Sequence, residues 1–198
     1  MIVAIEHYSV SVTDDLTHGL AATLRAARTD RELSVNALAE RSGVSRAMIA
    51  KIERGEAQPT AALLGRLAAA LGLTLSELFA RTEGESPRLA RRSEQTVWVD
   101  PATGYRRRSV SPATGSAQLV EVELPAGAAV GYPADAFAIA AHQIYVLAGR
   151  LRFHEGDVQH DLAAGDCLEL GAPAPCTYRN VTTETCRYLV ILSPRRTG

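Results

Sequence analysis

The chain has 198 residues, a net charge of −1 at neutral pH and 46% hydrophobic residues. This composition excludes a disordered polar chain and a strongly basic coat protein for nucleic acid, but it leaves open a specific DNA reader, because local charge matters more than the sum. No apolar run reaches the roughly 18 residues of a membrane span, and the three cysteines lack CxxC spacing. We therefore expect one or two small domains in the cytoplasm, with reduced thiols and no membrane partner.

The first part of the chain, residues 1–16, is interpreted as an N-terminal extension. Its first 12 residues alternate weakly between apolar and polar side chains. This pattern is compatible with an extra strand or with a disordered segment, and the sequence favours neither.

Residues 17–80 have the pattern of an all-α domain. Apolar residues recur at helical spacing along this segment. Gly43, Gly55 and Gly72 each follow a periodic run, where the C-terminus of a helix requires a positive φ angle. The pattern predicts five short helices. Four residues are placed where helix N-caps belong: Ser34, Ser45, Thr60 and Thr74.

The segment "LAERSGVSRAMIAKIERGEAQPT" predicts two short helices joined by a turn at Gly43. Such a pair can place its second helix in the major groove of DNA. On that second helix Ile49 and Ile52 belong to the core side, which leaves the opposite face for DNA. The segment resembles the Xre, phage-repressor-like family of helix-turn-helix regulators, and the resemblance extends over about residues 18–80.

This resemblance implies a double-stranded DNA operator as the partner. Arg46, Ala47 and Lys51 would face base edges, because arginine and lysine bind guanine O6 and N7 and an alanine methyl can contact thymine. The remaining contacts would be to phosphates. The full implied DNA-facing set is Ser45, Arg46, Ala47, Lys51 and Arg54. The resemblance also implies a structural ion pair between Arg28 and Glu53, and a bundle used only for protein contact is the alternative.

Residues 81–94, "RTEGESPRLARRSE", are interpreted as a linker, because helical periodicity stops and charged residues, Gly and Pro take over. Residues 95–198 then alternate with period two between frequent turn residues, which predicts a β-sandwich or barrel. The stretches "IYVLAGRLRF", "LAAGDCLEL" and "CTYRN" resemble the cupin fold. The expected architecture is therefore a five-helix helix-turn-helix domain followed by an all-β cupin barrel, a double-stranded β-helix.

The resemblance to cupins also bears on metal binding. Metal-binding cupins supply two histidines and a glutamate from a first motif and a histidine from a second. Here His142 stands in the glutamate position, Cys176 stands in the last histidine position, and residues 137–141 contain no donor. A tight site needs three or four protein ligands, so we expect no metal and no cofactor. A residual zinc site at His142 and Cys176, helped by Tyr132 or by an effector, is the alternative.

Strand alternation predicts a mostly apolar pocket inside this barrel. If His142 points inward, Ala140, Ile144 and Val146 do so too, and Tyr178 would follow Cys176. An inert barrel that serves only for dimerisation is the alternative. The effector-binding residues expected on this basis are His142, Cys176, Tyr178, Tyr132 and Ile144.

The order of the two domains matches Xre-type regulators with cupin tails. It implies a homodimeric transcriptional regulator, a repressor rather than an activator, that senses a small-molecule effector and is not an enzyme. The alternative function is a metal-dependent cupin enzyme, such as an oxygenase or epoxidase, with a helix-turn-helix domain attached. That chemistry requires two histidines and a carboxylate around the metal, and the motif positions supply one histidine and one thiol.

Overall fold

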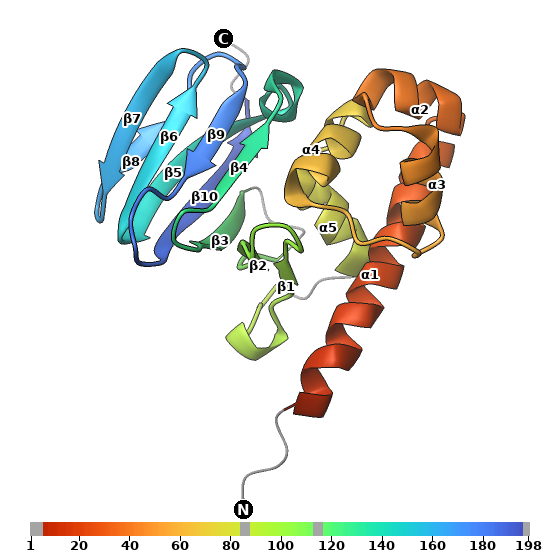
Figure 1. Cartoon of the computed structure of the whole chain (residues 1–198), viewed down its shortest axis with the longest axis horizontal. Helices are drawn as coiled ribbons and strands as arrows, with labels where there is room; N and C mark the ends of the chain where they lie inside the picture. Colours follow the sequence, from red (N-terminus) through yellow and green to blue (C-terminus); the bar gives the residue numbers. More distant parts are fainter. Residues whose placement is uncertain (1–5, 84–87, 113–116, 196–198) are drawn as a thin grey trace, which may run out of the picture.

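The computed structural model describes residues 6–83, 88–112 and 117–195, and it consists of a helical unit followed by two β-sheets (Figure 1). The expected order of a five-helix unit followed by an all-β unit is confirmed, although the sheets face each other without closing into one ring of strands. The helices of the first unit are α1 (Glu6–Thr29), α2 (Val35–Ser42), α3 (Arg46–Glu53), α4 (Ala61–Ala70) and α5 (Leu75–Glu83).

Helix α1 differs from the expectation for the N-terminal extension. It begins at Glu6, so the strand alternative is wrong for residues 6–12, while residues 1–5 lie outside the described residues. Figure 1 shows the first half of α1 extending away from the rest of the molecule. The weak apolar alternation was therefore not the signal of a strand, since residues 6–12 are the first turns of α1.

The helix ends follow the chemistry that the sequence predicted. The side-chain oxygens of Ser34, Ser45 and Thr60 accept hydrogen bonds from backbone N–H groups at the starts of α2, α3 and α4. Thr74 forms a reciprocal capping box with Glu77, with distances of 3.0 and 2.7 Å. Gly43 ends α2 in the left-handed conformation, with φ of 65°. Caps of this kind stabilise a helix by about 1 kcal/mol each, so these short helices have defined ends.

The predicted ion pair between α1 and α3 is also confirmed. Arg28 donates from Nε and Nη2 to the two carboxylate oxygens of Glu53, at 2.7 and 2.8 Å. A third donor, Nη1, reaches the carbonyl oxygen of Leu33 at 2.8 Å. The hydrogen bond with Glu53 raises the pKa of Arg28. This pair of hydrogen bonds holds the last turn of α3 against α1 and so fixes the orientation of α3 relative to α1.

The β-strands are short and all their pairings are antiparallel. One sheet has the order β1-β2-β3-β10-β5-β8 and the other has the order β4-β9-β6-β7. Two 3-10 turns, η1 (Arg92–Glu94) and η2 (Ala134–Phe137), lie between strands or before them. The strands are β1 (Val97–Val99), β2 (Arg106–Ser109), β3 (Gln118–Leu124), β4 (Ala129–Tyr132), β5 (Ala140–Ala148), β6 (Arg150–Glu155), β7 (Val158–Ala163), β8 (Cys167–Glu169), β9 (Cys176–Arg179) and β10 (Cys186–Pro194).

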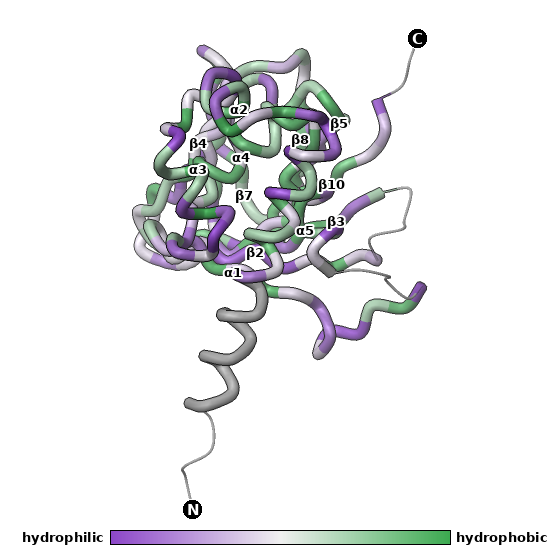
Figure 2. The backbone as a smooth tube through the Cα atoms, turned by 90° about the vertical axis from the view of Figure 1, so that its right-hand side faces the viewer, coloured by the Kyte–Doolittle hydropathy of each residue, from purple (hydrophilic) through white to green (hydrophobic). Residues whose placement is uncertain are grey.

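Strand β5 shows the predicted alternation between a buried and an exposed face. Gln143, Tyr145 and Leu147 are exposed, whereas the residues between them are buried. The inward set contains Ala140, His142, Ile144 and Val146, as the sequence predicted. Between the sheets the rings of Tyr178 and Tyr188 stack with an interplanar angle of 5°. Figure 2 shows hydrophobic residues along much of α4, whose core side contains Ala61, Leu64 and Leu67.

The helical unit is docked on the sheets through α5 and the β1–β2 hairpin. Trp98 packs against Phe79 of α5 with ring centroids 5.6 Å apart. The guanidinium of Arg107 lies 4.6 Å from the centroid of the Phe79 ring and donates a hydrogen bond to the Ser76 hydroxyl. Because these four side chains are almost fully buried, the two units share one hydrophobic core.

A second set of docking contacts involves α4. The carboxylate of Asp100, which follows β1, accepts a hydrogen bond at 3.2 Å from the backbone N–H of Ala61 at the start of α4. A negative charge at a helix N-terminus is favourable, and both groups are buried.

Among the described residues no single helix could span a membrane. Helices α4 and α5 together are long and apolar enough, but they bend by 93° at their junction.

Candidate functional site

The exposed face of α3 is the first candidate site. Ser45 caps the helix by accepting a hydrogen bond at 3.2 Å from the N–H of Met48. Arg46, Ala47 and Lys51 are exposed, while Ile49 and Ile52 on the opposite side are buried. The helix therefore has one face fixed in the core and one basic face open to solvent, with its N-terminal end unobstructed. Four of the five predicted DNA-facing residues lie together on this face.

Arg54 is the fifth predicted residue, and its surroundings differ from those of Arg46. Its guanidinium forks onto the carboxylate of Glu56, with distances of 2.6 and 2.7 Å. That hydrogen bond lowers the pKa of Glu56, so the carboxylate stays ionised at neutral pH. A phosphate contact from Arg54 would have to share the guanidinium with Glu56. Arg46, by contrast, makes a long contact of 3.4 Å with the neutral side chain of Asn36.

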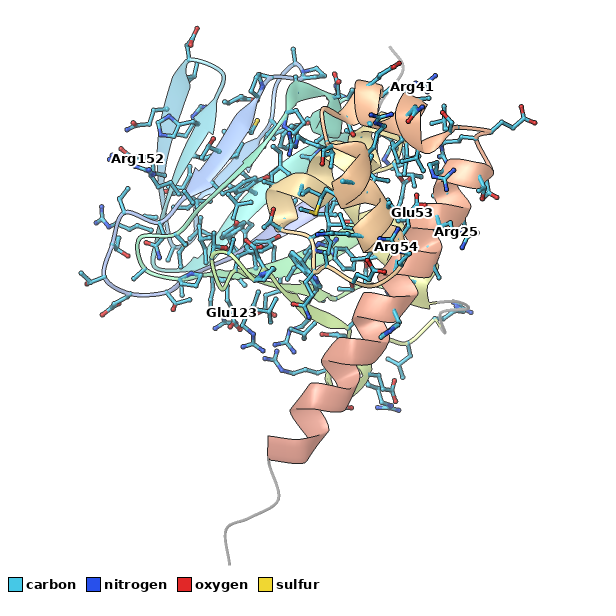
Figure 3. All side chains as sticks on the ribbon, turned by 45° about the vertical axis from the view of Figure 1, so that its right-hand side comes forward. Arg25, Arg41, Glu53, Arg54, Glu123 and Arg152 are labelled. Carbon is cyan, nitrogen blue, oxygen red and sulfur yellow. The ribbon has the colours of Figure 1, made fainter. Side chains whose placement is uncertain are left out.

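Two further exposed arginines flank α3, and the sequence analysis missed both. Arg41 lies at the end of α2, and it points outward on the side of the helical unit away from the sheets (Figure 3). Arg66 of α4 reaches the α2–α3 turn, where it donates to the carbonyl oxygen of Gly43 at 3.4 Å. The apolar period of α4 would have identified Arg66, because Leu64 and Leu67 take the core side and leave it outside.

The second candidate site is a cavity of about 70 Å³ between the helical unit and the mouth of the two sheets, which we call the interdomain cavity. Both units contribute to its walls. The helical unit supplies Gly65, Leu73, Leu75 and Ser76. The polar residues from the sheets and the connections between their strands are Tyr105, Arg107, Tyr132, His142, Tyr178 and Tyr188.

The predicted pocket residues divide into two groups. His142, Tyr132 and Tyr178 line the interdomain cavity, whereas Cys176 and Ile144 are not among its lining residues. Ile144 is fully buried in the core between the sheets. The Cys176 thiol donates to the carbonyl oxygen of Ala174 at 3.2 Å, and burial raises its pKa to about 12, so it is a protonated thiol at neutral pH. Strand alternation correctly turned Cys176 inward, but it could not say at which depth the cavity ends.

His142 has one ring nitrogen engaged. Its Nδ1 lies 3.0 Å from the carbonyl oxygen of Ala140, and its ring meets the Phe137 ring with centroids 5.1 Å apart. Burial lowers the pKa of His142, which favours the neutral ring. Since a carbonyl oxygen can only accept, Nδ1 carries the proton and Nε2 is left as an acceptor.

The charge of the interdomain cavity comes from Arg107. Burial raises the pKa of Tyr105, Tyr132, Tyr178 and Tyr188, so these phenols are neutral hydrogen-bonding groups. The cavity lining that the structure describes contains no Asp or Glu side chain. The cavity is therefore apolar, rich in phenol hydroxyls and positive at one wall.

A metal site is the remaining possibility raised by the sequence. Within the described ranges, no group of three or more His, Cys, Asp or Glu side chains is arranged to hold a metal ion. Of the two candidate ligands, His142 faces a backbone carbonyl oxygen through Nδ1 and keeps Nε2 as an acceptor, and the Cys176 thiol donates to a backbone carbonyl oxygen.

Two family models match separate segments of the chain. The HTH_3 helix-turn-helix model matches residues 24–78, and the Cupin_2 cupin-domain model matches residues 120–192. Among curated proteins, the HTH-type transcriptional regulator SutR of Escherichia coli (strain K12) is 30% identical over 109 residues, which cover 52% of this chain and 61% of SutR. An uncharacterised HTH-type transcriptional regulator of Mycobacterium tuberculosis is 30% identical over 87 residues, 44% of this chain and 62% of that protein. The aligned part thus spans about three fifths of these relatives.

Solved structures include one similar over nearly the whole chain. An HTH_3 family transcriptional regulator from Vibrio cholerae has 28% identity and a TM-score of 0.75, covering 93% of this chain and 100% of that one. A hydroxypropylphosphonic acid epoxidase from S. wedmorenis has 17% identity and a TM-score of 0.45, covering 89% and 97%. The epoxidase match is too distant to bear on chemistry in this chain.

Proposed function

We propose that this protein is a sequence-specific DNA-binding transcriptional regulator and not an enzyme. The chain joins a segment that matches the HTH_3 helix-turn-helix model, of the Xre type, to a segment that matches the Cupin_2 model. The observation that carries this proposal is the exposed basic face of α3, whose opposite face is buried in the core. The names of the relatives as transcriptional regulators support it. Repressor action is proposed by analogy with the family alone.

In this proposal α3 enters the major groove with its N-terminal end toward the bases. Arg46 and Lys51 read base edges, and Ser45 lies near a phosphate. Arg41 and Arg66, which lie near the turn between α2 and α3, contact the flanking phosphates, which fixes the position of the helix without reading sequence. We assign the DNA-binding unit to residues 17–80, the linker to 81–94 and the cupin unit to 95–198.

We further propose that the protein binds DNA as a homodimer formed through the outer face of the six-stranded sheet. Tyr145 and Leu147 are 38% and 37% exposed on this face. In the strand register Leu189 of β10 stands directly beside Tyr145, and Ile191 stands one pair further along, between Leu119 and Gln143. Leu189 and Ile191 are partly buried, so the apolar strip is partly exposed, and such a strip is a candidate protein–protein interface. A two-fold dimer would present two α3 helices to half-sites about 34 Å apart.

The interdomain cavity is the proposed effector site, because it is concave, largely apolar and carries a few polar groups. Its position between the units gives an effector direct contact with α4 and α5 of the helical unit. An effector acts by binding more tightly to one arrangement of the two units than to another.

The test of the proposed function is a selection of binding sites from random duplex DNA with the purified full chain. We expect enrichment of a pseudo-palindrome whose half-sites are about 10 base pairs apart. Absence of any enriched sequence would contradict the proposal. Metal analysis of the same preparation distinguishes the cupin-enzyme alternative, since near-stoichiometric iron together with no enriched DNA site would favour that alternative.

A further inference from the structure

One side of the interdomain cavity is formed by a tight contact between the Tyr132 ring and the backbone of α4. The ring of Tyr132, at the end of β4, lies directly on the backbone of α4 at Gly65. A Cβ atom at position 65 would be 2.8 Å from Tyr132 Cε1 and closer still to Cδ1. Glycine in the middle of a helix is unfavourable relative to alanine by about 1 kcal/mol, so here it permits the close approach of the two units.

The volume of the cavity limits what it can hold in this arrangement. About 70 Å³ is room for a few water molecules, whereas ligand sites usually measure about 300–1,000 Å³. An organic ligand of more than a few atoms therefore fits wholly inside the cavity only if one wall moves. The sheet walls are held by ladders of backbone hydrogen bonds, while the wall formed by α4 and α5 rests on side-chain contacts. The α4–α5 wall is the part that can yield.

Arg107 belongs both to the cavity and to the docking contact. It lines the cavity, and the same guanidinium donates to Ser76 and covers the ring of Phe79 on α5. An anionic ligand drawn to this guanidinium competes with Ser76 for its N–H donors. Such a ligand would weaken docking through the residue that binds it.

We propose that the interdomain cavity binds a small monocarboxylate with an apolar body, seated on Arg107, and that its entry separates α4 and α5 from the sheets. The apolar lining, including Leu73, Phe137 and Leu192, receives the body of the ligand. An amino acid fits less well, because its ammonium group would require a carboxylate, and the described lining offers none. The consequence for DNA binding rests on the proposed function, but binding and separation do not.

The chain contains a built-in reporter of this separation. Trp98 is its single tryptophan, 8% exposed and packed against Phe79 of α5. Separation exposes the indole to water and shifts its fluorescence emission to longer wavelength. We would titrate the full chain with sodium butyrate, hexanoate and benzoate, and with the corresponding neutral amides, at up to millimolar concentration. We expect at least one acid to shift the emission, and its amide to bind about tenfold more weakly, since a charged hydrogen bond is lost.

Two variants with matched controls separate the parts of the proposal. Gly65→Ala should shift the Trp98 emission without any ligand, because the added Cβ displaces Tyr132, and it should abolish the further response to acid. The control is Ala62→Ser on the exposed side of α4, which should have neither effect. Arg107→Gln should abolish the preference for acid over amide, while Arg106→Gln on the same strand retains it. If Arg107→Gln does not fold, Arg107→Lys keeps a positive charge and should retain the preference at reduced affinity.

The outcomes distinguish this proposal from the proposed function. If no acid shifts Trp98, or if acids and amides act equally, the proposal is wrong even when the protein binds DNA specifically. If acids bind and shift Trp98 but no DNA sequence is selected, the cavity proposal stands and the proposed function fails. Measuring DNA affinity with and without the active acid then tests whether the two are coupled.

Discussion

Arg28, Arg46 and Arg54 lie in or near α3 and differ in whether a carboxylate already binds the guanidinium group. Arg54 is forked onto Glu56 and Arg28 onto Glu53, so both guanidinium groups already serve a carboxylate. Arg46 is exposed, and its guanidinium makes a long contact of 3.4 Å with the neutral amide oxygen of Asn36. Base reading is therefore expected to depend on Arg46 and Lys51 more than on Arg54, which the sequence could not distinguish from them.

The first prediction concerns Arg46. Arg46→Ala should weaken binding to the selected DNA site by about 1–3 kcal/mol and relax specificity at one base position, because one bidentate base contact is lost. Fluorescence anisotropy with single-base variants of the site measures both effects. Arg152→Ala, on β6 of the cupin unit (Figure 3), is the control and should leave binding unchanged. An equal loss on every DNA sequence would contradict base reading by Arg46.

The second prediction is a pH dependence that originates at His142. Burial lowers the pKa of His142 in the folded protein, so the unfolded chain binds a proton at higher pH than the folded one does. Stability is therefore retained above the unfolded value of about 6.5 and falls as the pH decreases below it. Urea denaturation at a series of pH values should show this slope in the wild type and a smaller one in His142→Gln. His154→Gln, in the half-exposed β6 strand, is the control, and an unchanged slope in His142→Gln would refute the assignment.

At the scale of elements, the helices were more predictable than their surroundings. Caps at Ser34, Ser45 and Thr60 depend on a few adjacent residues, which is why local sequence was sufficient. The alternation along β5 was likewise local. The start of α1 was not predicted, because residues 6–12 carry no cap signal and their weak alternation suits a strand equally well.

The third prediction tests how α1 supports α3. Arg28→Met leaves the carboxylate of Glu53, whose side chain is only 7% exposed, without its partner. We expect a loss of about 3 kcal/mol in the free energy of unfolding, since an uncompensated carboxylate is costly in a partly buried site. Arg25→Met, which removes an exposed arginine from the same helix, provides the control and should change stability by less than about 0.5 kcal/mol. Equal stability of the two variants would show that the fork contributes little.

At the scale of the whole molecule, the arrangement of the two units is set by contacts between residues distant in sequence. Asp100 binds the N-terminus of α4, and Arg107 holds Ser76 on α5. The apolar strip that contains Tyr145 and Leu147 lies on the outer face of the six-stranded sheet. Docking of the helices and the proposed pairing of two molecules therefore involve different residues.

The fourth prediction concerns the proposed dimer interface alone. Tyr145→Glu should convert the proposed dimer into monomers, because it places a charge in the centre of the apolar strip. Sedimentation velocity measures the change, and binding to a full palindrome should weaken more than binding to one half-site. Val158→Glu places the same charge at an exposed apolar position of β7 in the other sheet, so its dimer should persist. A dimer that survives Tyr145→Glu would place the interface elsewhere.

The sequence by itself determined the two kinds of domain, the helix caps, the Arg28–Glu53 pair and the inward face of β5, because each depends on local chemistry or on the regular period of one element. It also named His142, Tyr132 and Tyr178, which line the interdomain cavity. Only the tertiary structure decided that Cys176 and Ile144 lie outside the cavity lining and that Gly65, Ser76 and Arg107 belong to it. The physical reason is that a cavity wall is built by contacts between elements far apart in the chain, and periodicity within one element carries no record of its neighbours.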